Sequence, residues 1–211
     1  MKHVHDYLNQ HIRDQSIIGM GSGSTIEAYI PAAAKYIEAH GFDVTFVPTS
    51  RRTEKILNEY GMTTSLDIEK IELTIDGADY FTPSLMAIKG YGGALLREKQ
   101  IGYFSKEIII VANEHKKTDS FDGLKIPVEI NPFLFELTKF RIEDISKVMI
   151  TDRTDGDGRF ITDNDNYIAD CKFDSVTDIS SLHNSLINIP GVVETGIFDR
   201  YISKIISFND T

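Results

Sequence analysis

A glycine-serine segment of this chain has the composition of an anion-binding turn. Gly21-Ser22-Gly23-Ser24-Thr25 combines backbone N–H groups with three hydroxyls, and residues with helical spacing follow it. Helix N-termini attract anions because their first N–H groups lack partners within the helix. Ser22, Gly23, Ser24 and Thr25 therefore suit a phosphate group, although a tight turn with a helix cap would use the same residues.

Paired carboxylates form a second candidate site in Asp76-Gly77-Ala78-Asp79. The two aspartates stand three residues apart at the end of a predicted strand. Such a pair could hold hydroxyl groups of a ligand and shuttle oxygen-bound protons, with Gly77 and Ala78 offering their backbone. A simple turn with an aspartate cap is the ordinary explanation when the pair is taken alone.

A third segment brings a lysine, three glycines and a glutamate into ten residues, from Lys89 to Glu98. Glycine allows close approach of a ligand to the backbone, here at Gly90 and Gly92 on either side of Tyr91. Lys89 could stabilise an oxyanion while Glu98 moves a proton between neighbouring carbon atoms. Taken alone, Glu98 beside Lys99 is typical of a solvated helix residue.

A fourth segment, Asn113-Glu114-His115-Lys116, adds Lys116 as another cation, although a single surface lysine usually has no special role. Each of the four segments follows a predicted strand. In an open parallel sheet the loops after the strands meet at the carboxyl edge, where ligands bind. We therefore expect the four loops to converge.

Alternating strand and helix patterns predict the elements that position these loops. Apolar runs indicate strands at Ile17-Ile18, 44–47, 71–75 and 108–112, with helical spacing between them. Repeated strand-helix units predict an α/β fold with a doubly wound, mainly parallel sheet. Pro31 falls inside one predicted helix, which either kinks there or restarts with Pro31 in a new first turn.

The pattern changes near Pro127, which predicts a smaller inserted α+β domain. A helix is expected around Phe133, Leu134 and Leu137, a strand over 167–173, a helix around 182–186 and a last strand over 192–198. We expect residues 1–126 plus 190–211 to form the larger α/β catalytic domain and 127–189 the smaller one.

Composition narrows the class of ligand. The formal net charge of −10 disfavours nucleic acid and anionic membranes as partners, but leaves room for a small anion held by local lysines. No apolar run approaches the length of a membrane span, and we expect no signal peptide because the first residues lack an apolar stretch. The single cysteine, Cys171, cannot form an internal disulfide. Since neither a membrane span nor a signal peptide is expected, we expect a cytoplasmic protein. Because no residues have metal-ligand spacing, we expect no metal, and we also expect no cofactor.

Six ordered motifs closely resemble the ribose-5-phosphate isomerase A family, almost from end to end of the chain. They are, in order, Gly19 to Thr25, Thr49-Ser50, Asp76 to Asp79, Lys89 through Lys99, Thr162 through Asn166, and Ile189 through Gly196. The resemblance implies a fold shared with glucosamine-6-phosphate deaminases and CoA transferases, and homo-oligomers such as dimers or tetramers. It implies no cofactor.

The resemblance also implies an activity and roles for individual residues. The family interconverts D-ribose 5-phosphate and D-ribulose 5-phosphate through an enediolate, in the non-oxidative branch of the pentose phosphate pathway. By position, Ser22 to Thr25 would bind the phosphate, Asp76 and Asp79 the sugar oxygens, and Lys89 the enediolate oxygen. Glu98 would accept the proton. The resemblance also has Lys116 contacting the substrate and Lys2, by a looser match, contacting the phosphate.

Three residues depart from the family pattern and leave two alternatives open. Tyr80 stands in place of an acidic residue, Tyr91 in place of glycine and Asn113 in place of aspartate. A positive φ at Tyr91 would be strained. One alternative is a non-catalytic sensor of a sugar phosphate; the other is isomerisation or deamination of a different sugar phosphate. The presence of both Lys89 and Glu98 argues against a pure sensor.

Overall fold

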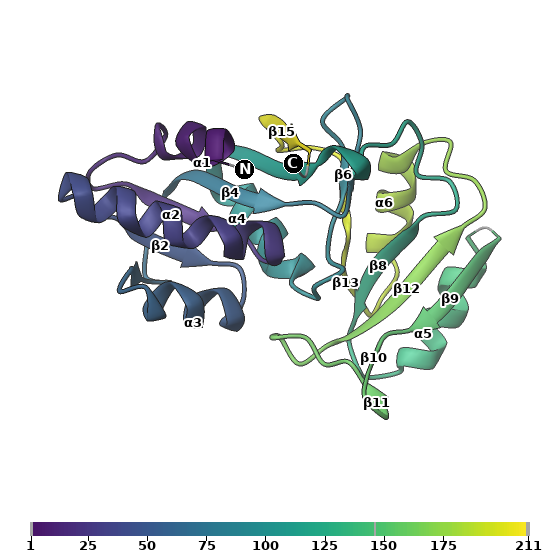
Figure 1. Ribbon diagram of the computed structural model, residues 1–211. Coiled ribbons are helices and arrows are strands. Elements are labelled where there is room, and N and C mark those ends of the chain that lie inside the picture. Colours follow the sequence, from purple (N-terminus) through teal and green to yellow (C-terminus); the bar gives the residue numbers. More distant parts are fainter. Residues whose placement is uncertain (1, 146, 210–211) are drawn as a thin grey trace. The chain divides into compact units, whose positions relative to one another are not determined.

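The computed structural model describes residues 2–145 and 147–209, and this part of the chain divides into two units. The first unit comprises residues 2–78, 97–117 and 200–209. The second comprises residues 79–96 and 118–199. Figure 1 shows the elements of both (Figure 1).

Six parallel strands form the sheet of the first unit. The strands are β1 (Ile17–Met20), β2 (Thr45–Pro48), β3 (Thr63–Thr64), β4 (Ile71–Gly77), β7 (Ser105–Asn113) and β15 (Lys204–Phe208). Their order across the sheet is β15-β7-β4-β1-β2-β3, and every neighbouring pair is parallel. The predicted doubly wound parallel sheet is thereby confirmed.

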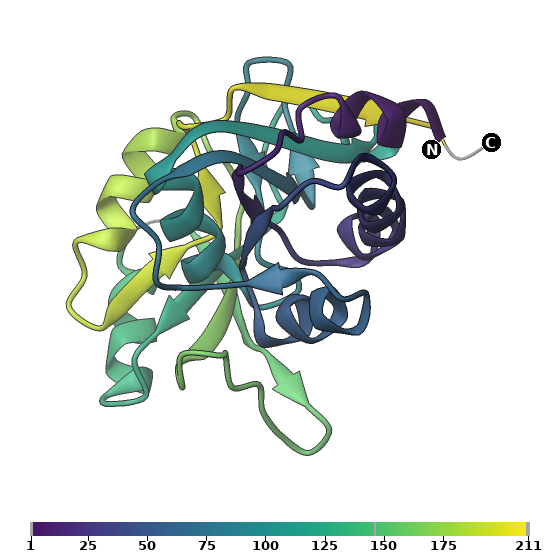
Figure 2. The ribbon, with the colours of Figure 1, turned by 90° about the vertical axis from the view of Figure 1, so that its left-hand side faces the viewer.

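Helices cover both faces of this sheet. Those of the unit are α1 (Lys2–Asn9), α2 (Ser24–His40), α3 (Arg51–Glu59), α4 (Leu95–Phe104) and the short 3-10 helix η1 (Glu114–Lys116). Helices α1, α2 and α3 bury their apolar residues with Ile18, Phe46 and Ile75 in the main core, and Figure 2 shows α2 and α3 on one side of the strands (Figure 2). Ile101 of α4 packs with Val47 in a separate cluster, on the other side.

The C-terminal end of α2 follows from local sequence. Gly41, with a φ of 64°, ends the helix in the left-handed conformation that glycine adopts without strain. Between Ser24 and His40 the helix is continuous, with Pro31 inside it. Of the two possibilities that the sequence leaves at Pro31, a restart is therefore wrong.

The second unit is built from antiparallel strands. A four-stranded sheet has the order β13-β8-β12-β9, a three-stranded sheet has the order β14-β6-β5, and β10 pairs with β11. The elements are β5 (Tyr80–Phe81), β6 (Ala87–Ile88), β8 (Lys125–Ile130), α5 (Phe135–Glu143), β9 (Val148–Asp152), β10 (Thr154–Asp155), β11 (Gly158–Arg159), β12 (Tyr167–Phe173), α6 (Ile179–Ile187), β13 (Val192–Thr195) and β14 (Ile197–Phe198).

The two faces of the four-stranded sheet differ in character. Ile126 and Val128 on β8 alternate with Glu129, and Cys171 on β12 follows Asp170. Because side chains alternate between faces along a strand, one face is apolar and packs against α5 and α6, while the other carries two buried carboxylates.

Several predicted elements need correction. The expected last strand over 192–198 is two strands in different sheets, because Gly196 interrupts it, and β15 follows as an additional parallel strand. Phe133 and Leu134 precede α5 instead of belonging to it. The strand expected before Lys89 is the two-residue β6, and the two-residue β5 was missed because so few residues show no periodicity.

The units also have bounds that differ from the two predicted domains. Residues 79–96, 118–126 and 190–199 group with the second unit, whereas the sequence pattern assigns them to the larger domain. The physical reason is strand pairing: β6 pairs with β14, and β13 pairs with β8. The predicted domain limits remain a prediction. No helix of residues 2–145 and 147–209 has both the length and the apolar character that a membrane crossing requires.

Candidate active site

The glycine-serine turn of the first unit joins a cluster of hydroxyl groups. Ser22 Oγ lies 2.7 Å from Thr49 Oγ1, 2.9 Å from Ser50 Oγ and 3.1 Å from Thr53 Oγ1. Ser50 also caps α3 by accepting a hydrogen bond from the Thr53 N–H at 3.0 Å. The Thr49-Ser50 motif is thus brought to the turn, and Thr53, which sequence reasoning did not single out, completes the cluster.

The same turn begins α2 with an exposed N-terminus. Gly23, with a φ of 94°, precedes the helix, and no side chain caps it. The first N–H groups of a helix have no acceptor within the helix, and the helix dipole adds positive potential there. Ser24 and Thr25 are the first residues of this 17-residue helix. An anion could bind here, as the sequence predicts.

Asp76 is buried beside the turn. Its Oδ1 accepts hydrogen bonds from the N–H groups of Ser22, at 3.3 Å, and Gly77, at 2.7 Å. A Cβ atom on Gly21 would lie 1.9 Å from this oxygen, so only glycine permits the approach. Asp76 is 2% exposed. The candidate phosphate turn and the first aspartate of the Asp76 to Asp79 motif therefore form one hydrogen-bonded group.

Lys116 reaches the same motif from the end of β7. Its ammonium donates a hydrogen bond to the Ala78 carbonyl at 2.7 Å. The side chain of Asn113 accepts a hydrogen bond from the His115 N–H at 3.1 Å and so caps η1, which carries Lys116. Asparagine performs this capping as aspartate would. The departure at Asn113 therefore preserves the local structure.

Glu98 lies at the carboxyl edge of the parallel sheet. Ser105 follows α4 directly and pairs with Ile71, the first residue of β4, so the helix ends at the amino edge. Ile101 packs so closely beneath Gly19 that a Cβ there would meet it at 2.6 Å. Glu98, three residues earlier, lies ~4.5 Å nearer the carboxyl edge on the same helix face.

The burial of Glu98 contradicts the view of a solvated helix residue. Its side chain is on the covered face of α4, and the residue is only 5% exposed. A buried carboxylate is costly unless neighbours compensate for the lost hydration. Its position at the ligand-binding edge of the sheet therefore favours a functional group over a surface residue.

Lys89 is a buried cation of the second unit. It follows β6 directly and is 2% exposed, with its ammonium 5.4 Å from the centre of the Phe198 ring. The Lys89 N–H donates a hydrogen bond to the Gly196 carbonyl at 2.9 Å. Gly196 faces the Lys89 carbonyl so closely that a Cβ would lie 2.2 Å from that oxygen.

Asp79 and Tyr91 are joined within the second unit. The Tyr91 N–H donates a hydrogen bond to Asp79 Oδ2 at 2.9 Å, and the phenol donates to the Lys125 carbonyl at 3.1 Å. The φ of Tyr91 is not positive, so the backbone strain expected from the sequence does not arise. Its ring packs against the core and contacts Tyr80 at 6.1 Å between centres.

The two tyrosine departures therefore form one packing unit. Burial is the largest cause that raises the pKa of the Tyr91 phenol, which stays protonated and can keep donating its hydrogen bond. Tyr80 is partly buried against the same apolar cluster. Both side chains thus serve the core of the second unit.

Two further groups on the polar face of the four-stranded sheet escaped sequence reasoning. Glu129, fully buried, accepts hydrogen bonds at Oε1 from Thr162, Asn164 and Asn166, at 2.8, 3.3 and 2.9 Å. The Thr162 to Asn166 motif therefore supplies donors to one oxygen of this buried carboxylate, whose Oε2 has no hydrogen-bond partner among the described residues. Arg153 makes a buried ion pair with Asp170.

The convergence of the four loops stays a prediction, but one of its premises is wrong, because the third loop does not end a strand of the parallel sheet. The loops after β1, β4 and β7 end parallel strands of one sheet, and they carry Ser22 to Thr25, Asp76 to Ala78, and Lys116. The loop with Lys89, Gly90, Tyr91 and Gly92 follows β6, which belongs to an antiparallel sheet of the second unit. Asp79 also belongs to the second unit. A strand of two residues carries no signal of parallel or antiparallel pairing.

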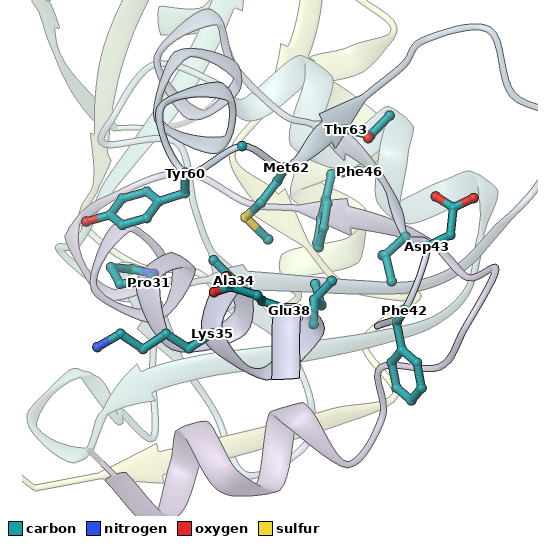
Figure 3. A pocket seen from close by; sticks show the side chains of 13 residues that line it. Pro31, Ala34, Lys35, Glu38, Phe42, Asp43, Phe46, Tyr60, Met62 and Thr63 are labelled. Carbon is teal, nitrogen blue, oxygen red and sulfur yellow. The ribbon is translucent and has the colours of Figure 1, made fainter. Parts of the chain in front are cut away.

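A separate pocket of about 550 Å³ opens in the first unit between α2, the residues that follow α3 and the amino ends of β2 and β3 (Figure 3). Phe46 and Met62, labelled in Figure 3, belong to its apolar lining and to the main core. Its charged residues are Lys35, Glu38 and Asp43. One lysine against two carboxylates disfavours a phosphate, and none of the predicted site residues lines this pocket.

The comparisons with known proteins decide the family. A family model described as ribose 5-phosphate isomerase A (phosphoriboisomerase A) matches residues 45–210. The chain belongs to the ribose 5-phosphate isomerase A family. A curated ribose-5-phosphate isomerase A from Sinorhizobium medicae is 39% identical over 204 residues, covering 93% of this chain and 88% of the relative.

Solved ribose 5-phosphate isomerases have the same fold. The enzyme from Methanocaldococcus jannaschii superposes with a TM-score of 0.91 at 29% identity, over 97% of this chain and 92% of the other. A ribose-5-phosphate isomerase in complex with phospho-erythronic acid has the same TM-score at 31% identity, over 96% of this chain and 91% of the other. The family resemblance of the sequence motifs is therefore confirmed.

The motifs shared with the ribose 5-phosphate isomerase A family have different structural roles in this chain. Those at Gly19, Thr49, Asp76 and Lys89 supply candidate ligand groups, whereas the motif that ends at Gly196 shapes the backbone beside Lys89. In residues 2–145 and 147–209, no group of three or more histidine, cysteine, aspartate or glutamate residues is arranged to hold a metal ion.

Proposed function

We propose that this chain interconverts D-ribose 5-phosphate and D-ribulose 5-phosphate, with Glu98 as the proton-transferring base. The observation that carries the proposal is the arrangement in the first unit. A buried glutamate lies at the same sheet edge as the glycine-serine turn, Asp76 and Lys116. Family membership supports the choice of substrate.

The proposed reaction begins with the open-chain sugar bound through its phosphate to the turn from Ser22 to Thr25. The Glu98 carboxylate takes the proton from C2, and the C–H electron pair forms the C1–C2 double bond. The aldehyde oxygen becomes an enediolate oxygen, which the Lys89 ammonium stabilises.

The second half returns the same proton to C1. The hydroxyl on C2 loses its proton as the ketone forms, and the former aldehyde oxygen gains one. In the proposal Asp76 and Asp79 carry these oxygen-bound protons, and Lys116 assists in holding the substrate. Protons and electrons balance without an oxidant or a co-reactant, as isomerisation requires.

The buried charges support assigning catalytic work to these groups. Asp76, Lys89 and Glu98 are each at most 5% exposed. Placing a charge away from water costs free energy that an apolar residue would not. In a water-poor site the same charges act more strongly on a developing enediolate. Lys2, which is exposed at the start of α1, stays a predicted phosphate contact.

Replacement of Glu98 tests the proposal. Glu98→Gln keeps the size of the side chain but removes the base, so we expect kcat to fall about a thousandfold or more. Binding of phospho-erythronic acid, measured by calorimetry, should stay within a fewfold of that of the unaltered protein. Glu107→Gln, at an exposed position of β7, is the matched control and should leave both quantities unchanged.

Near-normal turnover by Glu98→Gln would refute the assignment of the base. Turnover should also survive a chelator, since the proposal uses no metal. The sensor alternative loses its main support, because Tyr80 and Tyr91 pack in the core of the second unit. Binding of ribose 5-phosphate without turnover by the unaltered protein would revive it, and turnover only of another sugar phosphate would favour a changed substrate.

We further propose that the chain is a cytoplasmic homo-oligomer. Large apolar side chains are exposed on and before α5, where Phe133 is 77% and Leu137 and Phe140 are each 63% exposed. Contiguous exposed apolar residues mark interaction sites in globular proteins. A second copy of the chain is the proposed occupant of this surface, and no nucleic acid or membrane is involved.

A further inference from the structure

The loop that carries Lys89 is fastened by an arginine 63 residues away in sequence. Arg153 lies between β9 and β10, and its Nη1 donates hydrogen bonds to the carbonyls of Gly90, at 2.7 Å, and Tyr91, at 3.1 Å. These are the first two residues after Lys89. The guanidinium therefore holds the backbone where the loop leaves the lysine.

Asp170 fixes the other side of the same guanidinium. Arg153 Nε donates to Asp170 Oδ2 at 3.1 Å, and Nη2 donates to Oδ1 of the same carboxylate. The two side chains are only 10% and 8% exposed. Since the fork of donors is planar and rigid, orienting one edge by a carboxylate also orients the edge that faces the loop.

Other contacts hold the remaining part of the loop. The Gly93 N–H donates to the Gly90 carbonyl at 2.9 Å, and a Cβ on Gly93 would lie 2.5 Å from the Phe160 ring. The Asp79 carboxylate accepts a hydrogen bond from the Tyr91 N–H. Gly92, by contrast, is exposed with open space beside its α carbon. The loop is thus fixed on one side and leaves Gly92 accessible.

We propose that Arg153, oriented by Asp170, is a positioning residue that sets the location of the Lys89 ammonium for the reaction. This inference rests on the proposed function, in which Lys89 stabilises the enediolate. Displacement of a catalytic group by about 1 Å can cost about a hundredfold in rate. Two backbone carbonyls and a carboxylate are more acceptors than a lysine could satisfy with the same geometry.

Stability alone would give a different pattern of effects. A buried ion pair can often be replaced by apolar residues of similar volume without loss of stability, whereas removal of one partner leaves a buried charge without compensation. The double variant Arg153→Met/Asp170→Leu therefore separates the two roles. It removes both charges together and also removes the donors to the Gly90 and Tyr91 carbonyls.

The test measures kcat, the thermal midpoint and inhibition by inorganic phosphate. We expect the double variant to keep a thermal midpoint near that of the unaltered protein while kcat falls about a hundredfold. The inhibition constant for phosphate should not change, because the phosphate turn lies in the other unit. The kcat of the Arg153→Lys variant should stay well below that of the unaltered protein. Arg159→Gln, which removes a more exposed arginine that binds Asp152 and Glu136, should retain normal kcat.

Several outcomes would overturn the inference. Normal kcat in a folded double variant would show that the loop keeps its place without Arg153. A fall in kcat that only follows the folded fraction, measured by circular dichroism, would leave a structural role alone. Absence of isomerase activity in the unaltered protein would instead refute the proposed function, and with it the basis of this inference.

Discussion

At the scale of single residues, burial distinguishes three of the groups with proposed chemistry from the many surface charges. The chain has 32 acidic and 22 basic residues, yet Asp76, Lys89 and Glu98 are among the few that are almost fully buried. Charged side chains rarely leave water without compensation. Their burial therefore points to sites that the rest of the fold is built to support.

Gly196 provides a test of how closely the backbone must fit around Lys89. A Cβ at this position would lie 2.2 Å from the Lys89 carbonyl oxygen and 2.8 Å from Pro127. We expect Gly196→Ala to lower the thermal midpoint and to reduce kcat at least tenfold, because the backbone at Lys89 must move. Enzyme assays and thermal unfolding measure both effects.

A glycine in open surroundings serves as the control for this substitution. Gly158 would place a Cβ no closer than 3.8 Å to its nearest neighbour, the Asp155 carbonyl. Gly158→Ala should therefore leave kcat and thermal midpoint nearly unchanged. Equal behaviour of the two variants would contradict the proposed fit at Gly196.

At the scale of elements, an ion-pair network joins α5 to β9. Lys139 Nζ lies 2.5 Å from Asp152 Oδ1, and Arg159 Nε lies 3.1 Å from Asp152 Oδ2. Burial raises the pKa of Asp152, but hydrogen bonds from Lys139 and Arg159 outweigh it, and the net pKa lies below its ordinary value. The carboxylate therefore stabilises the folded state in its charged form.

The lowered pKa of Asp152 gives a sign for the dependence of stability on pH. Its contribution is fully present above the ordinary aspartate pKa and is lost as the pH falls through the lower pKa of the folded state. We expect Asp152→Asn to reduce the free energy of unfolding by about 1 kcal/mol at pH 7. The difference between the two proteins should narrow below pH ~4.

Urea unfolding between pH 3 and pH 8 measures this difference. Asp157→Asn, in the exposed turn between β10 and β11, is a suitable control that should change stability little at any pH. If the difference in free energy of unfolding between Asp152→Asn and the unaltered protein stayed constant down to pH 3, the charged form of Asp152 would not be the source of the stabilisation.

At the scale of the whole molecule, the surface around α5 has the features of a contact between two copies. Leu137 and Phe140 lie one turn apart and are exposed. In an antiparallel pair of α5 helices with Leu137 against Phe140 of the second copy, the exposed Glu136 would face Arg141. A two-fold interface of this kind is complementary to itself in both shape and charge.

Substitution of the apolar residues tests the proposed association. Leu137→Glu/Phe140→Glu should convert an oligomer to monomers in sedimentation equilibrium, because four carboxylates would then face one another across the pair. Leu66→Glu, at another exposed apolar position in the first unit, should leave the mass unchanged. A monomeric unaltered protein, or an oligomer that survives the double substitution, would contradict this assignment of the surface.

Contiguous sequence was sufficient to predict the doubly wound parallel sheet and the candidate segments that follow three of its strands. The apolar runs that became β1, β4 and β7 each end at a motif, and such patterns depend only on neighbouring residues. The family resemblance added roles for Glu98 and Lys89. The burial of Glu98 was not predictable, because periodicity around one glutamate does not show which face of a helix is covered.

Only the tertiary structure revealed the groups that depend on distant residues. Arg153 reaches Gly90 across 63 residues, and Glu129 Oε1 accepts a hydrogen bond from Thr162, 33 residues away. The strand before Lys89 is too short for its antiparallel pairing to be visible in sequence. Local patterns record the conformation of a segment, whereas its partners are selected when the chain buries its apolar surface and satisfies its polar groups.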